Sequence, residues 1–439
     1  MLGDGRVALC PADCAVATRC VLHYYFHNAA GDPGFMAFEV LRDSFHEALH
    51  QSLPLALTTD MQMTPWAHGG LTAGLSADHP VFPPAVRHHD ARCTIADMVR
   101  RDFALDSQPQ ALLDVPCIAN PLAGDALAVL VAVYMSDGVG VCLALSHAVV
   151  DIGGATRFCH EWCALARSMY AAAGTHHQPQ RLCSDRAWFW GAVSARRAPV
   201  DSAFYRHLYA RTAAQQPPKS GTAGAPLYRI AIAAEALGAL GDVRARACPG
   251  ASIPNFISAV IWRAILRARP DAEHAYFAAS LTVRTIEPAF ADYWGNTATM
   301  RYIHREAPAL RAAAIGEIAE AVQGCTSGFS VAEYADILER YTSTPEYLAR
   351  LEQFVEEGRA PLLMVANISR LPVYAADFGF GPPAKVCYPP FLPPGFAVFL
   401  PRSAAGGIDI LIHASDAAIR LLASDDLVRD HIAVTAYSP

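Results

Sequence analysis

The chain has 439 residues, of which 53% are hydrophobic and 17% charged, and its formal net charge is −7. This composition indicates a globular protein with a large core, and the length favours two domains of about 200 residues each. The net negative charge argues against a nucleic-acid-binding protein, which normally has a basic face. No apolar run approaches the ~20 residues that span a membrane, and the N-terminus lacks a secretory signal. We therefore expect a cytoplasmic protein without a nucleic-acid or membrane partner.

The twelve cysteines are too dilute for a disulfide scaffold and fit a reducing cytosol. The pairs Cys10/Cys14 and Cys159/Cys163 are not joined by a second pair that would complete a zinc pattern. We interpret them as buried thiols and predict no metal site. The pairs His88-His89 and His176-His177 lie in polar stretches and are predicted to be solvated loops.

In the N-terminal half, apolar residues from Phe38 to Leu53 fall at helical spacing, and Pro54 ends the run. Two strand-like runs follow, Ala126–Met135 and Val139–Leu145. The turn Ser136-Asp137-Gly138 between them predicts a hairpin.

The second of these strands leads into the most informative stretch of the chain, His147-Ala148-Val149-Val150-Asp151. The residues after it have helical spacing, so His147 is expected at a sheet end, where a fold can present a base to a cleft. Histidine is the side chain whose ordinary pKa suits proton abstraction near neutral pH. Taken alone, however, His-x-x-x-Asp is a weak motif, since 17 histidines give roughly one match by chance. A buried, hydrogen-bonded histidine is then the simpler interpretation.

The stretch 211–226 is polar and rich in Pro, Gly and small residues, which predicts a crossover linker. It divides the chain into an N-terminal lobe, 1–210, and a C-terminal lobe, 227–439. In the second lobe we expect a helix over Asn255–Arg267 and strands over Phe396–Leu400 and Ile408–His413. Helices mixed with hairpins favour an α/β fold with mixed sheets.

A second motif, Asp377-Phe378-Gly379-Phe380-Gly381, lies near the C-terminus. Gly379 and Gly381 permit backbone angles that other residues avoid, and the aromatic rings can anchor the segment by burial. We interpret the motif as a structural turn that supports the active site.

These two motifs, at this separation, resemble those of the BAHD acyltransferase family. The family carries His-x-x-x-Asp-Gly in mid-chain and Asp-Phe-Gly-Trp-Gly near the C-terminus. Further segments match in the same order, and ordered independent matches rarely coincide. They are Leu9-Cys10-Pro11-Ala12-Asp13, the helix 255–269, Val283-Arg284, Tyr293-Trp294-Gly295-Asn296 and Leu400-Pro401-Arg402.

The resemblance implies two chloramphenicol-acetyltransferase-like lobes with an active-site channel between them. An acyl-CoA, most simply acetyl-CoA, is then the co-substrate, with no tightly bound cofactor, and a small-molecule alcohol is the acceptor. His147 would be the general base, whereas Asp151 would pair with Arg284 and order the strand end. The family also implies a monomer.

Other residues have weaker assignments, each beside an ordinary structural alternative. Arg370 matches a position that binds acidic acceptors in some members, and Asn296 is expected to brace a loop near the channel. Four further residues could meet CoA: Ser252, Ser258, Thr282 and Arg402.

The departures from the family pattern resemble its fungal branch, which includes trichothecene O-acetyltransferase-like enzymes. Asp151 is followed by Ile152-Gly153-Gly154 rather than directly by Gly, Phe380 replaces Trp, and Thr282-Val283 replaces Asp-Gly. The alternatives are acyl transfer from a carrier protein, N-acyl transfer to an amine, and a binding module without catalysis. Carrier-dependent condensation domains usually have a second His where this chain has Ser146.

Overall fold

The structure, a computed structural model, describes residues 6–8, 10–14, 18–52, 61–62, 72–74, 84–118, 125–171, 183, 185–200, 204, 226–343, 361–402 and 406–437. Of the predicted linker only Pro226 is among them, and Pro54 and His176-His177 also lie outside the described residues. No helix within these ranges is long and apolar enough to cross a membrane.

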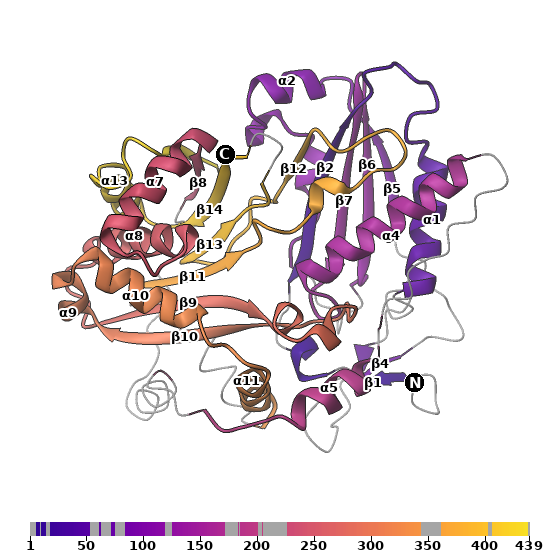
Figure 1. Cartoon of the computed structure of the whole chain (residues 1–439). Coiled ribbons are helices and arrows are strands. Elements are labelled where there is room, and N and C mark those ends of the chain that lie inside the picture. Colours follow the sequence, from indigo (N-terminus) through magenta and orange to yellow (C-terminus); the bar gives the residue numbers. More distant parts are fainter. Residues whose placement is uncertain are drawn as a thin grey trace.

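The first lobe is built on a five-stranded mixed sheet in the order β12-β2-β7-β6-β5 (Figure 1). The predicted hairpin is confirmed as antiparallel β6 and β7, and β5 runs parallel to β6. The loop expected at His88-His89 is wrong, because these residues end an edge strand, although their side chains are exposed as expected. The strands are β2 Arg19–His27, β5 Ala85–His89, β6 Ala128–Met135, β7 Gly138–Ser146 and β12 Lys385–Cys387.

Helices α1 (Phe38–Ser52) and α4 (Ile152–Tyr170) cover one face of this sheet. Both helices were predicted from their apolar spacing, and the spaced residues, such as Phe45 and Trp162, are fully buried against the sheet. The indole of Trp162 donates to the Leu41 carbonyl at 3.0 Å, which fixes α4 against α1. Cys159 and Cys163 are buried free thiols on α4, as expected.

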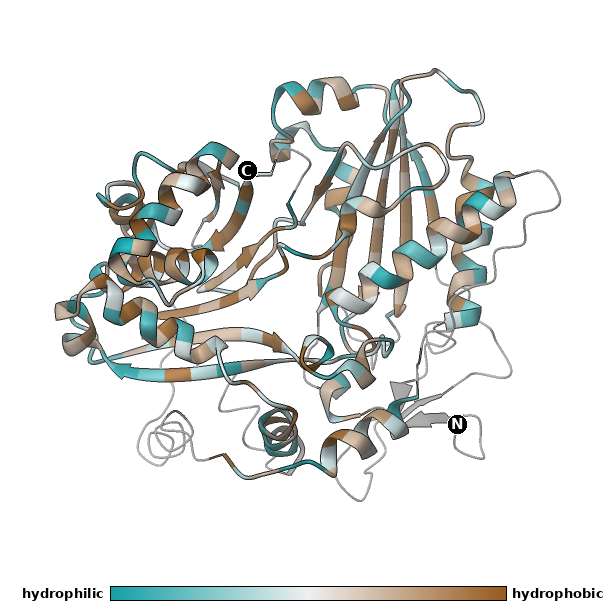
Figure 2. Ribbon diagram, viewed as in Figure 1, coloured by the Kyte–Doolittle hydropathy of each residue, from teal (hydrophilic) through white to brown (hydrophobic). Residues whose placement is uncertain are grey.

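The second lobe contains a seven-stranded mixed sheet in the order β10-β9-β11-β13-β14-β8-β15. The predicted helix near Asn255–Arg267 and the two predicted strands are confirmed as α8, β13 and β14. Brown apolar strands lie under helices whose outer sides are teal and hydrophilic (Figure 2). The strands are β8 Leu227–Ile232, β9 His274–Thr282, β10 Ala298–Glu306, β11 Leu362–Asn367, β13 Phe396–Phe399, β14 Ile408–His413 and β15 Ala433–Ala436. The helices are α7 Ala234–Ala247, α8 Ile253–Arg267, α9 Ala307–Ala312, α10 Ile315–Thr326 and α13 Asp416–Ala423.

Smaller elements complete the described chain. Strands β1, β4 and β3 form a three-stranded antiparallel sheet near the N-terminus. Their bounds, with those of the remaining helices, are β1 Arg6–Ala8, β3 Met61–Gln62, β4 Thr72–Gly74, α2 Ile95–Arg100, α3 Gln110–Leu113, α5 Arg186–Ser194 and α11 Val331–Ser343.

The two lobes of this α/β fold interlock at two places. The long ribbon of β9 and β10 reaches from the second lobe to the first, where Trp294 stacks on Phe158 with ring centroids 6.0 Å apart (Figure 1). Strand β12, from the C-terminal part of the chain, pairs with β2 in the first lobe. Residues far apart in sequence therefore meet at the end of β7.

The Asp377 motif belongs to this second crossing. The Asp377 carboxylate accepts from the backbone N–H groups of Gly379, Phe380 and Gly381 at 2.7–3.0 Å. Gly379 and Gly381 have φ of +104° and +95°, the region that favours glycine. The ring of Phe378 lies 4.7 Å from that of Trp162. The motif is thus a tight turn that places Phe378 in the core, against Trp162 of α4 and Phe26 of β2.

Candidate active site

Asp151 begins α4 and is its N-cap. Its side chain accepts from the Gly154 N–H at 2.8 Å, which satisfies one of the free donors in the first helical turn. His147 lies four residues earlier, directly after β7, and its backbone N–H donates to the Thr18 carbonyl. The strand end and the helix cap therefore fix both motif residues.

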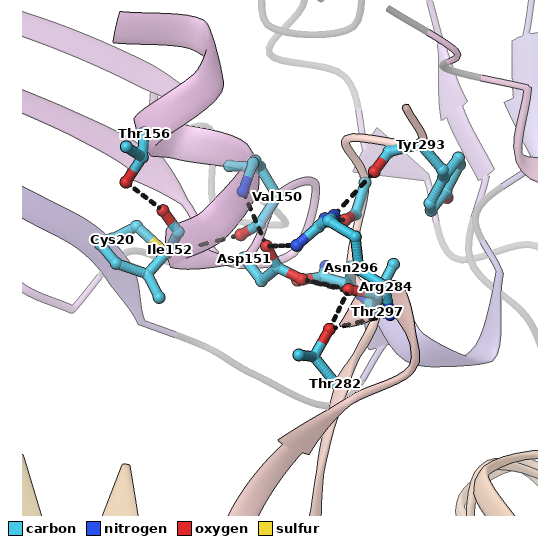
Figure 3. Close-up of polar contacts among 12 residues, drawn as sticks. Cys20, Val150, Asp151, Ile152, Thr156, Thr282, Arg284, Tyr293, Asn296 and Thr297 are labelled. Atoms are coloured by element: carbon cyan, nitrogen blue, oxygen red, sulfur yellow. Dashed lines mark hydrogen bonds and ion pairs between the residues drawn. The ribbon is translucent and has the colours of Figure 1, made fainter. Parts of the chain in front are cut away.

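The Asp151 carboxylate is bonded by two residues of the second lobe, Arg284 and Thr297 (Figure 3). Arg284 Nη1 donates to Oδ1 at 2.9 Å, and Thr297 donates to Oδ2 through its backbone N–H and its hydroxyl, at 2.9 and 2.8 Å. With the Gly154 bond, these fill the four acceptor positions of a carboxylate. No position remains for the imidazole, so Asp151 cannot relay a proton from His147.

Ionisation of Asp151 is set by two opposing effects. Burial disfavours the charged form, but Arg284 and the bonds from Gly154 and Thr297 outweigh it, so the pKa of this carboxyl lies below its usual value. Asp151 is therefore a carboxylate at neutral pH, and the ion pair with Arg284 links the lobes.

Two glycines allow the second lobe to approach the start of α4. A Cβ on Gly154 would lie 2.1 Å from the Trp294 carbonyl oxygen, and one on Gly153 would lie 2.6 Å from Arg284 Nη1. Real Cβ atoms essentially never come so close, so neither position tolerates a side chain without movement. The sequence Ile152-Gly153-Gly154 thus keeps the close contact despite its departure from the family pattern.

Arg284 also shapes the segment that faces His147. Its Nε and Nη2 donate to the carbonyls of Tyr293 and Gly295 at 2.9 and 2.8 Å (Figure 3). One guanidinium therefore binds the Asp151 carboxylate and two carbonyls of one loop, a use of its planar set of donors that lysine could not reproduce. The loop is held so that Asn296 points toward His147.

Asn296 fixes which ring nitrogen of His147 carries the proton. Its Nδ2 donates to the His147 carbonyl at 2.8 Å and to Asp13 Oδ1 at 2.9 Å, so its Oδ1 is the atom 3.1 Å from His147 Nδ1. A carbonyl oxygen only accepts, so Nδ1 donates and Nε2 keeps its lone pair in the neutral ring. The imidazole is half-buried, and Nε2 is the atom that can accept a proton.

Asp13 and Arg186 support this arrangement and were not identified as site residues from the sequence. Arg186 Nε donates to Asp13 Oδ2 at 2.9 Å, and its Nη2 donates to the Val149 carbonyl at 2.7 Å. Burial lowers the pKa of Arg186, but the Asp13 carboxylate more than compensates and raises it overall. Asp13 was part of a quoted motif without a role, and no sequence pattern distinguishes Arg186.

The other predicted residues divide into two groups. Thr282 is half-buried, and its hydroxyl bonds that of Thr297 at 2.8 Å, within the network around Asp151. Ser258 is buried, and its hydroxyl donates to the Pro254 carbonyl inside α8, so the structure gives it a helix-internal role. The exposed group comprises Ser252, the N-cap of α8, and the two arginines Arg370 and Arg402.

Comparison with known proteins identifies the family. A family model described as Transferase family matches residues 96–426. No curated protein sequence matches the chain. Similar solved structures include TRI101 of F. graminearum complexed with coenzyme A and T-2 mycotoxin, at a TM-score of 0.73 and 14% identity over 98% of this chain and 99% of that one.

Two more distant folds are also similar. Vinorine synthase has a TM-score of 0.64 and 15% identity, covering 94% of this chain and 91% of its own. The first condensation domain of the calcium-dependent antibiotic synthetase has a TM-score of 0.58 and 15% identity, covering 98% and 99%. These likenesses establish the fold, and the family model covers most of the chain. The chain therefore belongs to the Transferase family, that of the BAHD acyltransferases, and is an enzyme that transfers acyl groups.

Proposed function

We propose that the enzyme is an acyl-CoA-dependent O-acyltransferase, most simply an O-acetyltransferase, that modifies a hydroxylated specialised metabolite. The observation that carries this proposal is the bond between His147 Nδ1 and Asn296 Oδ1, which leaves Nε2 as a base at the end of β7. The coenzyme A bound in structures of similar fold supports CoA as the acyl carrier.

The reaction proceeds in a ternary complex. His147 Nε2 takes the proton of the acceptor hydroxyl while its oxygen attacks the thioester carbonyl. The tetrahedral oxyanion collapses, the C–S bond breaks, and the departing CoA thiolate receives the proton from the imidazolium. General-base catalysis of this kind contributes roughly 10²–10⁴-fold, and the positioning of two substrates contributes further.

Asp151 and Arg284 have a positioning role in this proposal. Their ion pair fixes the start of α4 to the loop that carries Asn296, so it sets the distance between Asn296 and His147. Asp377, Gly379 and Gly381 support α4 by holding the turn that places Phe378 against Trp162 in the core. None of these residues needs to touch substrate.

We assign the exposed arginines to substrate binding. Arg402 is proposed to meet a CoA phosphate, and Arg370 to meet an acidic group on the acceptor. The two segments are neighbours, because the Arg402 N–H donates to the Ser369 carbonyl at 3.3 Å. Ser252 remains a candidate for the CoA path.

The cellular setting is also part of the proposal. We propose a cytoplasmic monomer in which 1–210 and 227–439 form the two lobes, joined by the linker 211–226, with β12 of the second part crossing into the first lobe's sheet. The cysteines whose side chains the structure describes are free thiols, which supports a reducing compartment.

The test is CoA release from acetyl-CoA, followed with a thiol reagent, in the presence of a panel of alcohols and their amine counterparts. Release that depends on an alcohol and is lost in His147→Ala supports the proposal. Release only with amines would replace O-transfer by N-transfer. Transfer only from an acyl carrier protein would support the condensation-type reaction, whose fold is similar. No transfer from either donor would contradict both.

A further inference from the structure

A second cluster of polar side chains lies at the opposite end of the β9–β10 ribbon from His147. In the antiparallel register His274 is opposite Glu306 and Tyr276 is opposite His304, so all four side chains are on one face. The active-site end of the ribbon is the pair Thr282 and Ala298, eight residues further along. At about 3.3 Å per residue, the cluster is about 26 Å from that end.

Three side chains that could each supply a metal ligand converge in this cluster. His274 Nδ1 is 3.2 Å from His304 Nε2 and 3.3 Å from Glu306 Oε2, and His304 Nε2 is 3.7 Å from Glu306 Oε1. Tetrahedral zinc with bonds of about 2.0–2.2 Å places its ligand atoms about 3.4 Å apart. The observed separations of 3.2–3.7 Å, which involve both Glu306 oxygens, are therefore close to the ligand spacing of such a tetrahedron.

The three side chains compete with one another for the same hydrogen bonds. A neutral ring nitrogen carries either one proton or one lone pair, so His274 Nδ1 can satisfy only one of its two neighbours. Glu306 is the N-cap residue of α9, yet its side chain makes no capping bond. A cation at the centre would satisfy all three atoms at once.

The cluster is also held in place and open to solvent on one side. The His304 ring packs on the fully buried Tyr276, with centroids 5.2 Å apart, and lies 5.1 Å from the His274 ring. The side chains of His304, His274 and Glu306 are 12%, 27% and 61% exposed. The two imidazole rings are thus held by packing on Tyr276 and on each other, and the exposed Glu306 side offers a path for an ion.

We propose that His274, His304 and Glu306 bind one Zn²⁺ ion, with water in the fourth position. Two imidazole nitrogens and one carboxylate oxygen are a donor set that zinc accepts. The ion would fasten edge strand β10 to β9 just before α9, remote from the acyl-transfer site. Sequence motifs miss this site because 30 residues separate His274 from His304, and only the strand register brings them together.

The test uses the full chain after treatment with a chelator. Titration with Zn²⁺ by calorimetry should give one equivalent per chain. Co²⁺ should give the d–d absorption of a four-coordinate site without a thiolate charge-transfer band, which excludes the cysteines. Binding should weaken toward pH 5, where free histidine is protonated.

Two variants locate the site without removing its packing. His304→Phe keeps a ring on Tyr276, and Glu306→Gln changes an exposed group. Each should weaken Zn²⁺ binding by more than roughly tenfold. Loss of a residue that only hydrogen-bonds a metal ligand already costs about tenfold in affinity, so loss of a ligand itself should cost more. The double variant His88→Ala/His89→Ala, at the exposed edge strand β5, should bind as the parent does. Unchanged affinity in both site variants, a thiolate band, or no binding by the parent overturns the proposal.

Discussion

Two histidines of the first lobe lie in opposite surroundings, His23 in the middle of the five-stranded sheet and His147 directly after β7, at the end of the sheet. His23 lies on β2 between Cys142 of β7 and Cys387 of β12 and is fully buried, and neither of its ring nitrogens has a hydrogen-bond partner among the described residues. His147 is half-buried and bonded through Nδ1 to Asn296.

The difference follows from position in the sheet. In the middle, a side chain meets only the strands beside it and the apolar layer above, here with two thiols as cross-strand neighbours. At the end, the chain leaves the sheet and segments from the second lobe can reach it. Burial lowers the pKa of His23 to about 4, so its ring stays neutral and inert at physiological pH. Only the histidine at the end acquires an oriented ring.

The largest expected effect comes from removing the histidine at the end. His147→Ala should lower kcat by roughly 10²–10⁴-fold, about 3–5.5 kcal/mol of transition-state stabilisation, because the ring proposed to take the acceptor's proton is removed. The variant should remain folded, since a half-buried ring is removed from the surface of the sheet. Steady-state CoA release together with denaturant unfolding measures both, and turnover close to that of the parent would refute the assignment.

The second prediction concerns what holds the sheet end in place. Asp151→Ala leaves Arg284 buried without its carboxylate, which should cost about 3–5 kcal/mol of unfolding free energy and reduce the rate as well. The exposed pair of Arg100 and Asp97 offers a control. Asp97→Ala should cost less than about 1 kcal/mol. A fully stable Asp151→Ala protein in urea denaturation would contradict the structural role.

The sequence predicted the local parts of this site. Strand β7, helix α4 and the order His147 to Asp151 follow from short-range periodicity, and the resemblance implied the ion pair of Asp151 with Arg284 that the structure contains. The bond of Asn296 to the His147 ring did not follow, nor did the pair of Asp13 and Arg186. These contacts join residues 149 and 173 positions apart, and no periodic pattern encodes such distances.

The fold shows the same limit. The strands of two hairpins, β6–β7 and β13–β14, were predicted, but the β9–β10 ribbon and the pairing of β12 with β2 were not. Strand β12 has three residues, which carry no alternation, and its partner is more than 350 positions away. At His88-His89 the polar composition favoured a loop, although an edge strand can be polar on both faces when neither is covered. The burial of Ser258 on α8 likewise could not be predicted from its residue type, because it depends on the packing around the helix.

A third prediction tests the inert histidine. The pKa of His23 is about 4 in the folded protein and 6.5 ordinarily, so the unfolded chain binds more protons between these values. The unfolding free energy is therefore highest, as far as His23 is concerned, above pH 6.5, and it falls as the pH drops toward 4. Between pH 7.5 and pH 5 the loss should be about 2 kcal/mol.

His23→Met should remove this part of the pH dependence. Its thiol neighbours do not titrate in this range, since burial raises the pKa of Cys387 to about 12 and that of Cys142 still further. The measurement is the unfolding free energy of parent and variant at both pH values, with His88→Met at the exposed edge as control. Equal pH dependence in parent and His23→Met would show that the ring has a partner or solvent access.

The smallest expected effect comes from removing the hydrogen-bond partner of His147 Nδ1, so that this ring, like that of His23, is no longer held by a side chain. Asn296→Ala removes the partner of Nδ1, so the ring loses its fixed tautomer and the imidazolium loses an acceptor. The expected result is a roughly tenfold fall in kcat, about 1.4 kcal/mol, the contribution of one hydrogen bond. KM for acyl-CoA should stay within a few-fold, because an interaction that strengthens only as the proton moves affects kcat.

Tyr334→Phe provides the matched control for Asn296→Ala. The Tyr334 hydroxyl donates to the Asn296 backbone carbonyl at 3.4 Å, so its loss perturbs the same residue without touching the imidazole. This control should keep kcat near that of the parent. If both variants lose activity equally, or if KM rises as much as kcat falls in Asn296→Ala, then Asn296 shapes the loop and does not orient the base. The position of His147 at the sheet end would then explain only its exposure to solvent, and Asn296 would not account for the proton on Nδ1.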